Sequence, residues 1–469
     1  MKRRDFIRKT GKSVALAMGA SVFASARVLG SKNIPTVLRG GKCWYKDKWQ
    51  ILDIGISNEG KLIIGENDSL SGDNIIMVTD RIVSSGFIDI LADNSTNPKT
   101  TYPIFEKYKL SDGVTTALQM HGGSSDAGRY YREFESLPHR INFGVSTAVM
   151  FISYKTKDIN QKKKLIEKCL DEGALGISHS LEYMPLPYNE VLEYAKLAKL
   201  YDRTFFLHLR YSSPEKELLG IDEAIALSKD SGARVHIDHI HSTGGTYNMA
   251  LALSKIKDAI SAGQQITCCV YPYSNWATYL NSKRFDPGWQ QRFGLTFNDL
   301  QIVGTDKRIS AENFEYYRNA RKLVAVPEGT MSFENTIDLA LKEDFCMVGS
   351  DGGIQFEPRA NSHPRGAGCF ATFIRHGIEM GLNMEKIIEK ISYLPRTLIL
   401  PAMKNRGLIL EGMIADLTIF DPVTIDAMAT VENPNQYSEG IDWVFVNGNL
   451  AYHDRKFESF AGKPIKYNS

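Results

Sequence analysis

The chain has 469 residues, of which 43% are apolar and 23% are charged, and its formal net charge is +2. This is the composition of a globular protein with a sizeable core. The near-balance of charge excludes a dedicated nucleic-acid binder, which would concentrate Lys and Arg in one stripe. Most of the six cysteines lie in apolar runs. This placement favours buried free thiols over disulfides.

The first 26 residues have the features of an export signal. Arg3 and Arg4 precede a short apolar run at 14–23, and small residues follow at 24–26. The run is shorter than the roughly 20 residues that a membrane-spanning helix needs. The start RRDFIRK resembles twin-arginine signals, so we expect a twin-arginine signal peptide and a periplasmic or otherwise exported protein. The twin-arginine export machinery is then a partner, and no membrane span is expected in the mature chain.

Eight short apolar segments alternate with helical patterns through the middle of the chain. They lie at 84–93, 113–121, 141–150, 173–181, 203–210, 233–241, 266–273 and 345–351. The first seven recur about every 30 residues, which is the length of a βα unit. Near-continuous apolar strands alternating with helices predict an α/β fold, a (β/α)₈ TIM barrel at 85–401. A doubly wound open sheet is the alternative.

Three further segments lie outside this repeat. Residues 33–84 and 402–469 contain short strands separated by Gly turns, which predicts a small β-sandwich domain built from both termini. The long gap at 274–344, between the last two barrel strands, contains aromatic and charged residues. It predicts an excursion or lid over the mouth of the barrel.

The histidines indicate where the chemistry lies. Active sites of these barrels form at the carboxyl ends of the strands, and alternate residues of a strand share one face. His121, His208, His239 and Asp351 come from four different strands and point into one mouth by this rule. Three neutral imidazoles with an open fourth position suit a catalytic zinc ion. A carboxylate such as Asp351 beside it can move a proton.

Several motifs resemble a known family. They are GFID at 86–89, GVTT at 113–116, VYPY at 270–273, GSDGG at 349–353, HPRGAGCF at 363–370 and RGLILEGMIADLTIFDP at 406–422. With His208 and His239, they resemble the amidohydrolase superfamily, above all its D-aminoacylase and N-acyl-D-glutamate deacylase branch. The resemblance covers essentially the whole chain after the signal. It implies zinc-dependent hydrolysis of the amide of an N-acyl-D-amino acid to a carboxylate and a D-amino acid.

The resemblance also implies roles for single residues. His208 and His239 match the two histidines of the more buried metal, and Asp351 matches the catalytic acid/base. The residues that match the substrate-binding side are Arg365, His241, Tyr271 and His363. An arginine suits a carboxylate because its paired donors match the two oxygens.

Two stretches of the sequence depart from the family. After GFID the family has His-x-His as metal ligands, where this chain has Leu91 and Asp93. His121 stands where the glutamate branch has a ligating Glu, so His121, His208 and His239 would hold one zinc ion per chain. Three alternatives stay open: a catalytically degenerate amidohydrolase-like binding protein, a hydrolase of another amide (a dipeptide, a cyclic imide or an acylated amino sugar), and a structural or surface-binding protein.

Overall fold

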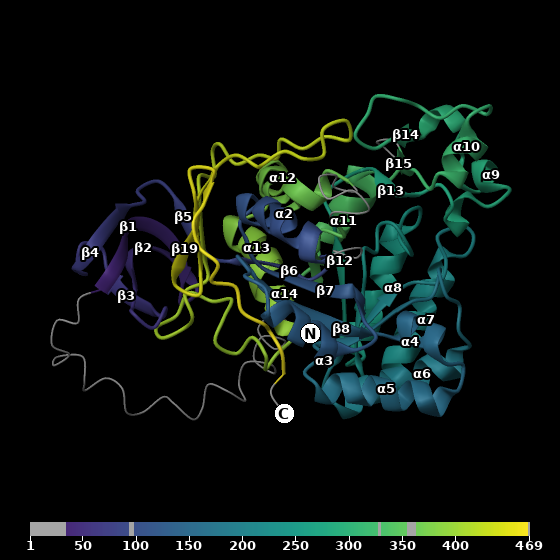
Figure 1. The fold of residues 1–469 in the computed structure, drawn as a ribbon, viewed down its shortest axis with the longest axis horizontal. Coiled ribbons are helices and arrows are strands. Elements are labelled where there is room, and N and C mark those ends of the chain that lie inside the picture. Colours follow the sequence, from purple (N-terminus) through teal and green to yellow (C-terminus); the bar gives the residue numbers. More distant parts are fainter. Residues whose placement is uncertain (1–33, 93–97, 327–329, 354–362, 468–469) are drawn as a thin grey trace.

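The computed structural model describes residues 34–92, 98–326, 330–353 and 363–467. Within these ranges the strands form an eight-stranded, a nine-stranded and a three-stranded sheet (Figure 1). None of the described helices combines the length and the apolar character needed to cross a bilayer. The segment interpreted as an export signal lies outside the described residues.

The eight-stranded sheet forms the barrel. Its strands are β6 (Phe87–Asp89), β7 (Val114–Ser124), β8 (Asn142–Ala148), β9 (Gly176–Ser180), β10 (Thr204–His208), β11 (Arg234–Ile237), β12 (Ile266–Val270) and β16 (Cys346–Val348). Every neighbouring pair is parallel, and the spatial order follows the chain order from β6 to β16. A doubly wound sheet would reverse its order at a switch point. The predicted barrel is therefore confirmed and the open sheet is excluded.

A buried ion pair joins the two ends of this sheet. Asp89 ends β6, and the backbone N–H of Ser350, just after β16, donates to its Oδ1 at 3.0 Å. Lys109 Nζ lies 2.8 Å from Asp89 Oδ2. Inside the barrel, Leu91, Met120 and other large side chains from several strands pack in one apolar cluster. The interior is thus a packed core, and any chemistry belongs at its mouth.

Helices cover the outside of the barrel. They are α2 (Pro98–Ser111), α3 (Ala127–Glu135), α4 (Val149–Lys155), α5 (Ile159–Asp171), α6 (Tyr188–Leu200), α7 (Glu217–Ser231), α8 (Met249–Ser261), α11 (Asp338–Leu341), α12 (Arg365–Glu379), α13 (Met384–Ile388) and α14 (Leu394–Thr397), with the π-helical turns η3 (Phe333–Ile337) and η4 (Glu389–Tyr393). The sequence pattern of α7 shows why such helices form and end. Ile221, Ala224 and Leu227 make one buried stripe, and the helix ends at Gly232, whose φ of 68° suits glycine.

The nine-stranded sheet contains strands from both ends of the chain. They are β1 (Ile34–Tyr45), β2 (Lys48–Ile56), β3 (Leu62–Glu66), β4 (Gly72–Met77), β5 (Ile82–Ser85), β17 (Leu417–Phe420), β18 (Ile441–Val446), β19 (Asn449–His453) and β20 (Lys456–Phe457). The junction is the antiparallel pair β17–β5, where Ile419 lies opposite Val83. The two β-rich ends of the sequence therefore lie in one sheet at one side of the barrel (Figure 1).

The excursion between β12 and β16 has its own small fold. It contains β13 (Trp276–Tyr279), η1 (Lys283–Phe285), α9 (Trp289–Phe293), η2 (Phe297–Asp299), β14 (Gln301–Ile302), α10 (Phe314–Asn319) and β15 (Leu323–Val326). Strand β15 pairs antiparallel with both β13 and β14. The rings of Trp276, Phe285 and Trp289 pack in series, with centroids 5.9 and 5.4 Å apart. Figure 1 shows this unit at the end of the molecule opposite the nine-stranded sheet.

All six cysteines are free and buried, as the apolar runs around them predict. Cys268 and Cys346 lie opposite each other on the neighbouring strands β12 and β16. Burial raises the pKa of the Cys268 thiol well above its ordinary value, and the neighbouring Cys346 adds to the shift. These thiols are therefore core side chains.

Candidate metal centre

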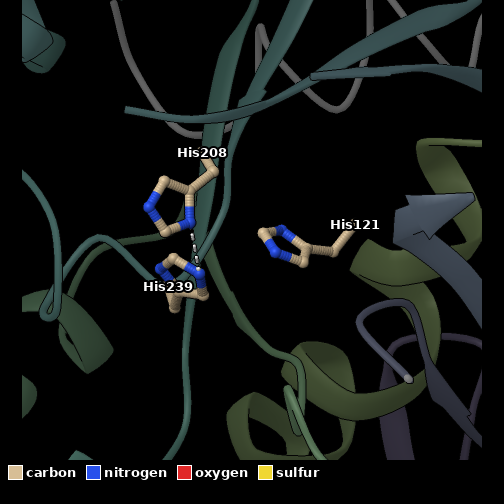
Figure 2. A group of neighbouring side chains, drawn as sticks. All are labelled: His121, His208 and His239. Atoms are coloured by element: carbon tan, nitrogen blue, oxygen red, sulfur yellow. Dashed lines mark hydrogen bonds between the residues drawn. The ribbon is translucent and has the colours of Figure 1, made fainter. Parts of the chain in front are cut away.

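Three histidines converge at the mouth of the barrel. His121 lies near the end of β7, His208 is the last residue of β10, and His239 follows the end of β11 by two residues. One ring nitrogen of each can be chosen so that all three lie within 4.8 Å of one another. The closest pair is His208 Nδ1 and His239 Nε2, at 3.1 Å. Figure 2 shows these two rings meeting edge to face, with His121 turned toward both from the opposite side.

The second nitrogen of each ring has its own partner. His208 Nε2 donates to Glu182 Oε2 at 2.9 Å, and His121 Nδ1 lies 2.8 Å from Asp238 Oδ2. His239 Nδ1 lies 3.0 Å from the hydroxyl of Ser242. A metal-binding histidine is usually held in this way, because a hydrogen bond on one nitrogen leaves the lone pair on the other. All three imidazoles show the arrangement.

Burial favours the neutral form of the His208 and His239 rings. The pKa of His208 is lowered from its ordinary value chiefly by burial. The pKa of His239 is lowered further, again first by burial and then by the neighbouring His208 and His121. A metal ligand must be unprotonated, so the environment favours the form of the rings that binds a metal.

This donor set fits a zinc ion. Two nitrogens that each lie about 2.05 Å from one tetrahedral ion are about 3.3 Å apart. The 3.1 Å between His208 Nδ1 and His239 Nε2 is close to that separation. The side chain of His121 is 18% exposed, and the centroid of its ring lies 5.3 Å from those of both His208 and His239. Three imidazoles leave one of the four tetrahedral positions open.

Leu91 and Asp93 stand at the two positions of the missing His-x-His motif. Leu91 is fully buried and packs with the apolar cluster of the barrel interior. Its backbone forms an isolated bridge with Gln119 of β7. Asp93 lies outside the described residues. The described residues therefore offer one group of three metal ligands, the histidine cluster.

Asp351 lies at the same mouth, after the end of β16, with a left-handed φ of 48°. Its carboxylate is paired with Arg365, whose Nη2 lies 2.8 Å from Oδ2. The Nε of Arg365 also donates to the backbone carbonyl of Asp351 at 2.8 Å. The other terminal nitrogen, Nη1, is buried and has no hydrogen-bond partner among the described residues. Arg365 therefore fixes Asp351 and keeps one donor group for a ligand.

The predicted substrate-binding residues gather around Tyr271. The guanidinium of Arg365 lies 4.3 Å from the centre of the Tyr271 ring, and the ring of His241 lies 4.1 Å from it. His241 is buried, and neither of its ring nitrogens has a partner among the described residues. His363 differs, because its Nε2 bonds Asn275 and its Nδ1 accepts the backbone N–H of Arg365. His241 has capacity for a ligand, whereas His363 supports the start of α12.

The structure corrects the strand-parity argument for two of these histidines. That argument places His239 and His241 on one face of an extended strand. Strand β11 ends at Ile237, and His239 has a positive φ of 27°. The chain turns there, and the backbone N–H of His239 donates to the sulfur of Cys269 on the next strand. His239 therefore joins the metal cluster, while His241 packs on Tyr271.

Sequence reasoning missed Glu182, Asp238 and Arg284. Glu182 stands two residues after β9, a position that follows the rule for barrel mouths. Asp238 has the opposite parity to His239, so the strand rule places it on the other face. Arg284 belongs to the excursion, and its buried contact with Glu182 at 3.0 Å joins segments 102 residues apart. No local pattern indicates that contact.

Burial alone would raise the pKa of Glu182. Arg284 outweighs that effect, and His208 and Ser212 add to it, so the pKa of the carboxyl lies well below its ordinary value. Glu182 is therefore an anion held inside the site. Its negative charge faces His208 directly.

Solved structures define the class of fold. A D-aminoacylase with a binuclear metal centre, for which one-metal activation and second-metal attenuation are described, matches 93% of this chain and 100% of its own, with a TM-score of 0.77 and 21% identity. The N-acyl-D-glutamate deacylase of Bordetella bronchiseptica, in complex with zinc and a phosphonate that mimics the tetrahedral intermediate, matches 93% and 100%, with a TM-score of 0.76 and 20% identity. The chain therefore shares its fold with these two enzymes over nearly its whole length.

Two sequence relatives show which enzymes the chain is similar to. The N-acyl-D-glutamate deacylase of Alcaligenes xylosoxydans xylosoxydans is 26% identical over 446 residues, which cover 84% of this chain and 88% of the relative. The D-aminoacylase of the same organism is 25% identical over 453 residues, 86% of this chain and 91% of the relative. No family model matches the chain. The relatives confirm the resemblance to the D-aminoacylase and N-acyl-D-glutamate deacylase branch.

Proposed function

We propose that the chain is a zinc-dependent hydrolase that deacylates an N-acyl-D-amino acid, releasing a carboxylate and a D-amino acid. One observation carries the proposal. His121, His208 and His239 converge at the mouth of the barrel, and the second nitrogen of each ring is hydrogen bonded. The sequence similarity to a D-aminoacylase and an N-acyl-D-glutamate deacylase over most of the chain supports the substrate class.

One zinc ion per chain would be held by the three histidines. Bound there, zinc supplies the Lewis acidity that makes amide hydrolysis possible near neutral pH. Leu91 supports a single ion, because a buried leucine offers no ligand atom where the family has a histidine. The related D-aminoacylase for which one-metal activation is described supports the same number.

The remaining steps belong to side chains of the chain itself. Asp351 accepts a proton from the attacking water and passes it to the nitrogen of the leaving amine. Arg365 holds this carboxylate in place at 2.8 Å. The free Nη1 of Arg365 and the ring of His241 are the donors for the carboxylate of the substrate. Tyr271 packs against both and orients them.

The proposal is tested with the purified chain. We expect about one zinc ion per chain and release of a free D-amino acid from at least one member of a panel of N-acetyl-D-amino acids, faster than from the L-enantiomer. Asp351→Asn should keep the metal and lose about 10²–10⁴-fold in kcat, the usual contribution of a general acid–base. His121→Ala should lower zinc affinity. His453→Ala, which removes an imidazole from β19, should leave metal content and turnover unchanged.

Other results of these experiments would contradict the proposal and support one of the alternative functions. Zinc binding with no turnover on any N-acyl amino acid would contradict the deacylase and direct the assay to dipeptides, cyclic imides and acylated amino sugars. A folded chain without zinc would favour a binding protein. Unchanged zinc affinity in His121→Ala would remove this residue from the ligand set.

We also propose that residues 1–26 direct the chain out of the cytoplasm through the twin-arginine export machinery. The pair Arg3–Arg4, the short apolar run and the small residues at 24–26 support the proposal. Replacing both arginines by Lys keeps the charge, so only recognition of the arginine pair is lost. We expect the wild-type chain in the periplasmic fraction and the Arg3→Lys/Arg4→Lys chain in the cytoplasm. Identical fractionation of the two would contradict the signal.

A further inference from the structure

Arg284 comes from the excursion, yet it is buried at the barrel mouth. It lies on η1, and only 6% of its side chain is exposed. Its Nη2 and Nε donate to Glu182 Oε2 at 3.0 and 3.3 Å. The same Nη2 also lies 3.2 Å from the backbone carbonyl of Ser242. A single guanidinium therefore joins two loops that follow different barrel strands.

Both of these partners hold a histidine of the metal centre. Glu182 Oε2, the atom that binds Arg284, also accepts the Nε2–H of His208 at 2.9 Å. Ser242 contacts Nδ1 of His239 through its hydroxyl at 3.0 Å. Arg284 thus acts on two of the three ligands, in each case through one intervening residue.

The position of the Glu182 carboxylate and the compensation of its charge depend on Arg284. Its carboxylate is nearly buried, with 12% of the side chain exposed, and Ser212 donates to its other oxygen. A buried carboxylate is costly unless a cation compensates its charge, and removing the cation leaves it unpaired. Ser212 and a neutral His208 bring no positive charge. Without Arg284, Glu182 would lose the donors that fix its Oε2, and His208 would lose an acceptor held in one position.

We propose that Arg284 is a positioning residue of the metal centre, fixing Glu182 and the Ser242 loop so that His208 and His239 present their free nitrogens to the same ion. The excursion then contributes a residue that the metal centre needs, in addition to lying beside it. The inference rests on the proposed zinc centre. It adds that a segment outside the eight βα units sets the geometry of that centre.

The test compares zinc affinity among folded variants. Zinc dissociation constants are measured by competition with a chelator for the wild-type chain, Glu182→Gln, Arg284→Gln, Arg284→Lys and Arg308→Gln. Arg308 is the matched control, because it lies in the same excursion, is exposed, and donates to the backbone carbonyl of Asp299 in η2 at 3.2 Å. The visible spectrum of the cobalt-substituted chain reports ligand geometry, and thermal unfolding of the metal-free chain reports the fold.

Loss of a residue that supports a metal ligand typically weakens metal affinity by about 10–100-fold. We expect losses of that size and an altered cobalt spectrum in Glu182→Gln and Arg284→Gln. Arg284→Lys should recover part of the loss, because lysine keeps the charge but cannot reach Glu182 and Ser242 with a rigid fork. Arg308→Gln should match the wild-type chain in both measurements.

Two failures are distinguishable. A wild-type chain that binds no zinc would overturn the proposed function and this inference with it. A wild-type chain that binds zinc, with Arg284→Gln equal to Arg308→Gln in affinity and spectrum, would overturn the inference alone. If Arg284→Gln does not fold, Arg284→Lys decides the question, since wild-type zinc affinity and an unchanged cobalt spectrum in that variant would exclude the positioning role.

Discussion

Lys109 is a buried cation at the seam between the first and last strands of the barrel. Its Nζ lies 2.8 Å from Asp89 Oδ2 and 2.9 Å from Ser350 Oγ, and neither charged side chain is exposed. Removing one partner of such a pair leaves an uncompensated buried charge, at a cost of roughly 3–5 kcal/mol. We expect Lys109→Met to lower the free energy of unfolding by about that amount, measured by denaturant titration.

A surface pair provides the control for this prediction. Lys255 and Asp222 lie 2.8 Å apart on exposed helix surfaces, and pairs of this kind contribute about 0–1 kcal/mol. Lys255→Met should therefore unfold close to the wild-type chain. The double change Lys109→Met/Asp89→Asn should recover part of the loss, since no charge is then left unpaired. Wild-type stability in Lys109→Met would show that other contacts hold the seam.

At the scale of single residues, the sequence predicted the histidines that face the proposed ion. It did not predict the residues that hold these histidines in place. His208 ends an apolar strand, and His121 and His239 stand at or just beyond such ends, so barrel geometry alone predicts their convergence. Glu182 and Arg284 act through tertiary contacts between segments far apart in the chain. Such contacts leave no periodic pattern in the sequence.

At the scale of elements, the barrel strands were predictable and the excursion was not. A strand buried on both faces is a near-continuous apolar run, which is visible along the chain. The three short strands of the excursion are ordered by one another and by packing of Trp276, Phe285 and Trp289. Aromatic residues pack in many arrangements, so their presence predicted an excursion without its conformation. The position of Arg284 depends on that conformation.

At the scale of the whole molecule, Asp112 lies where three parts of the chain meet. It follows α2, and its two carboxylate oxygens accept the backbone N–H groups of Phe370 and Ala371 in α12, both at 2.8 Å. Ser438, in the segment that leads to β18 of the nine-stranded sheet, donates to the same carboxylate at 3.0 Å. One buried carboxyl group thus connects a barrel helix, its neighbour and the C-terminal segment.

Stability should depend on pH through this group. Burial raises the pKa of Asp112 from 3.8 to about 7, against the opposing effect of its hydrogen bonds and of Lys109. Because the folded pKa is the higher one, the contribution of Asp112 is complete below pH 3.8, is lost progressively as the pH rises from 3.8 towards 7, and is gone above the folded pKa. At about 1.4 kcal/mol per pKa unit, the loss is on the order of 4 kcal/mol.

Asp112→Asn isolates this effect, because asparagine is a neutral analogue of the protonated acid at every pH. We expect the stability of the variant relative to wild type to rise between about pH 4 and pH 7, most steeply at about pH 5–6 where only the unfolded chain is ionised at this position, and to level off above pH 7. Urea titrations of both chains at intervals of half a pH unit measure the difference in the free energy of unfolding. The contributions of the other ionisable groups largely cancel in this difference. A difference that stays constant across this range would mean that Asp112 is charged in the folded protein throughout. The junction of the three segments would then contain a stable buried carboxylate.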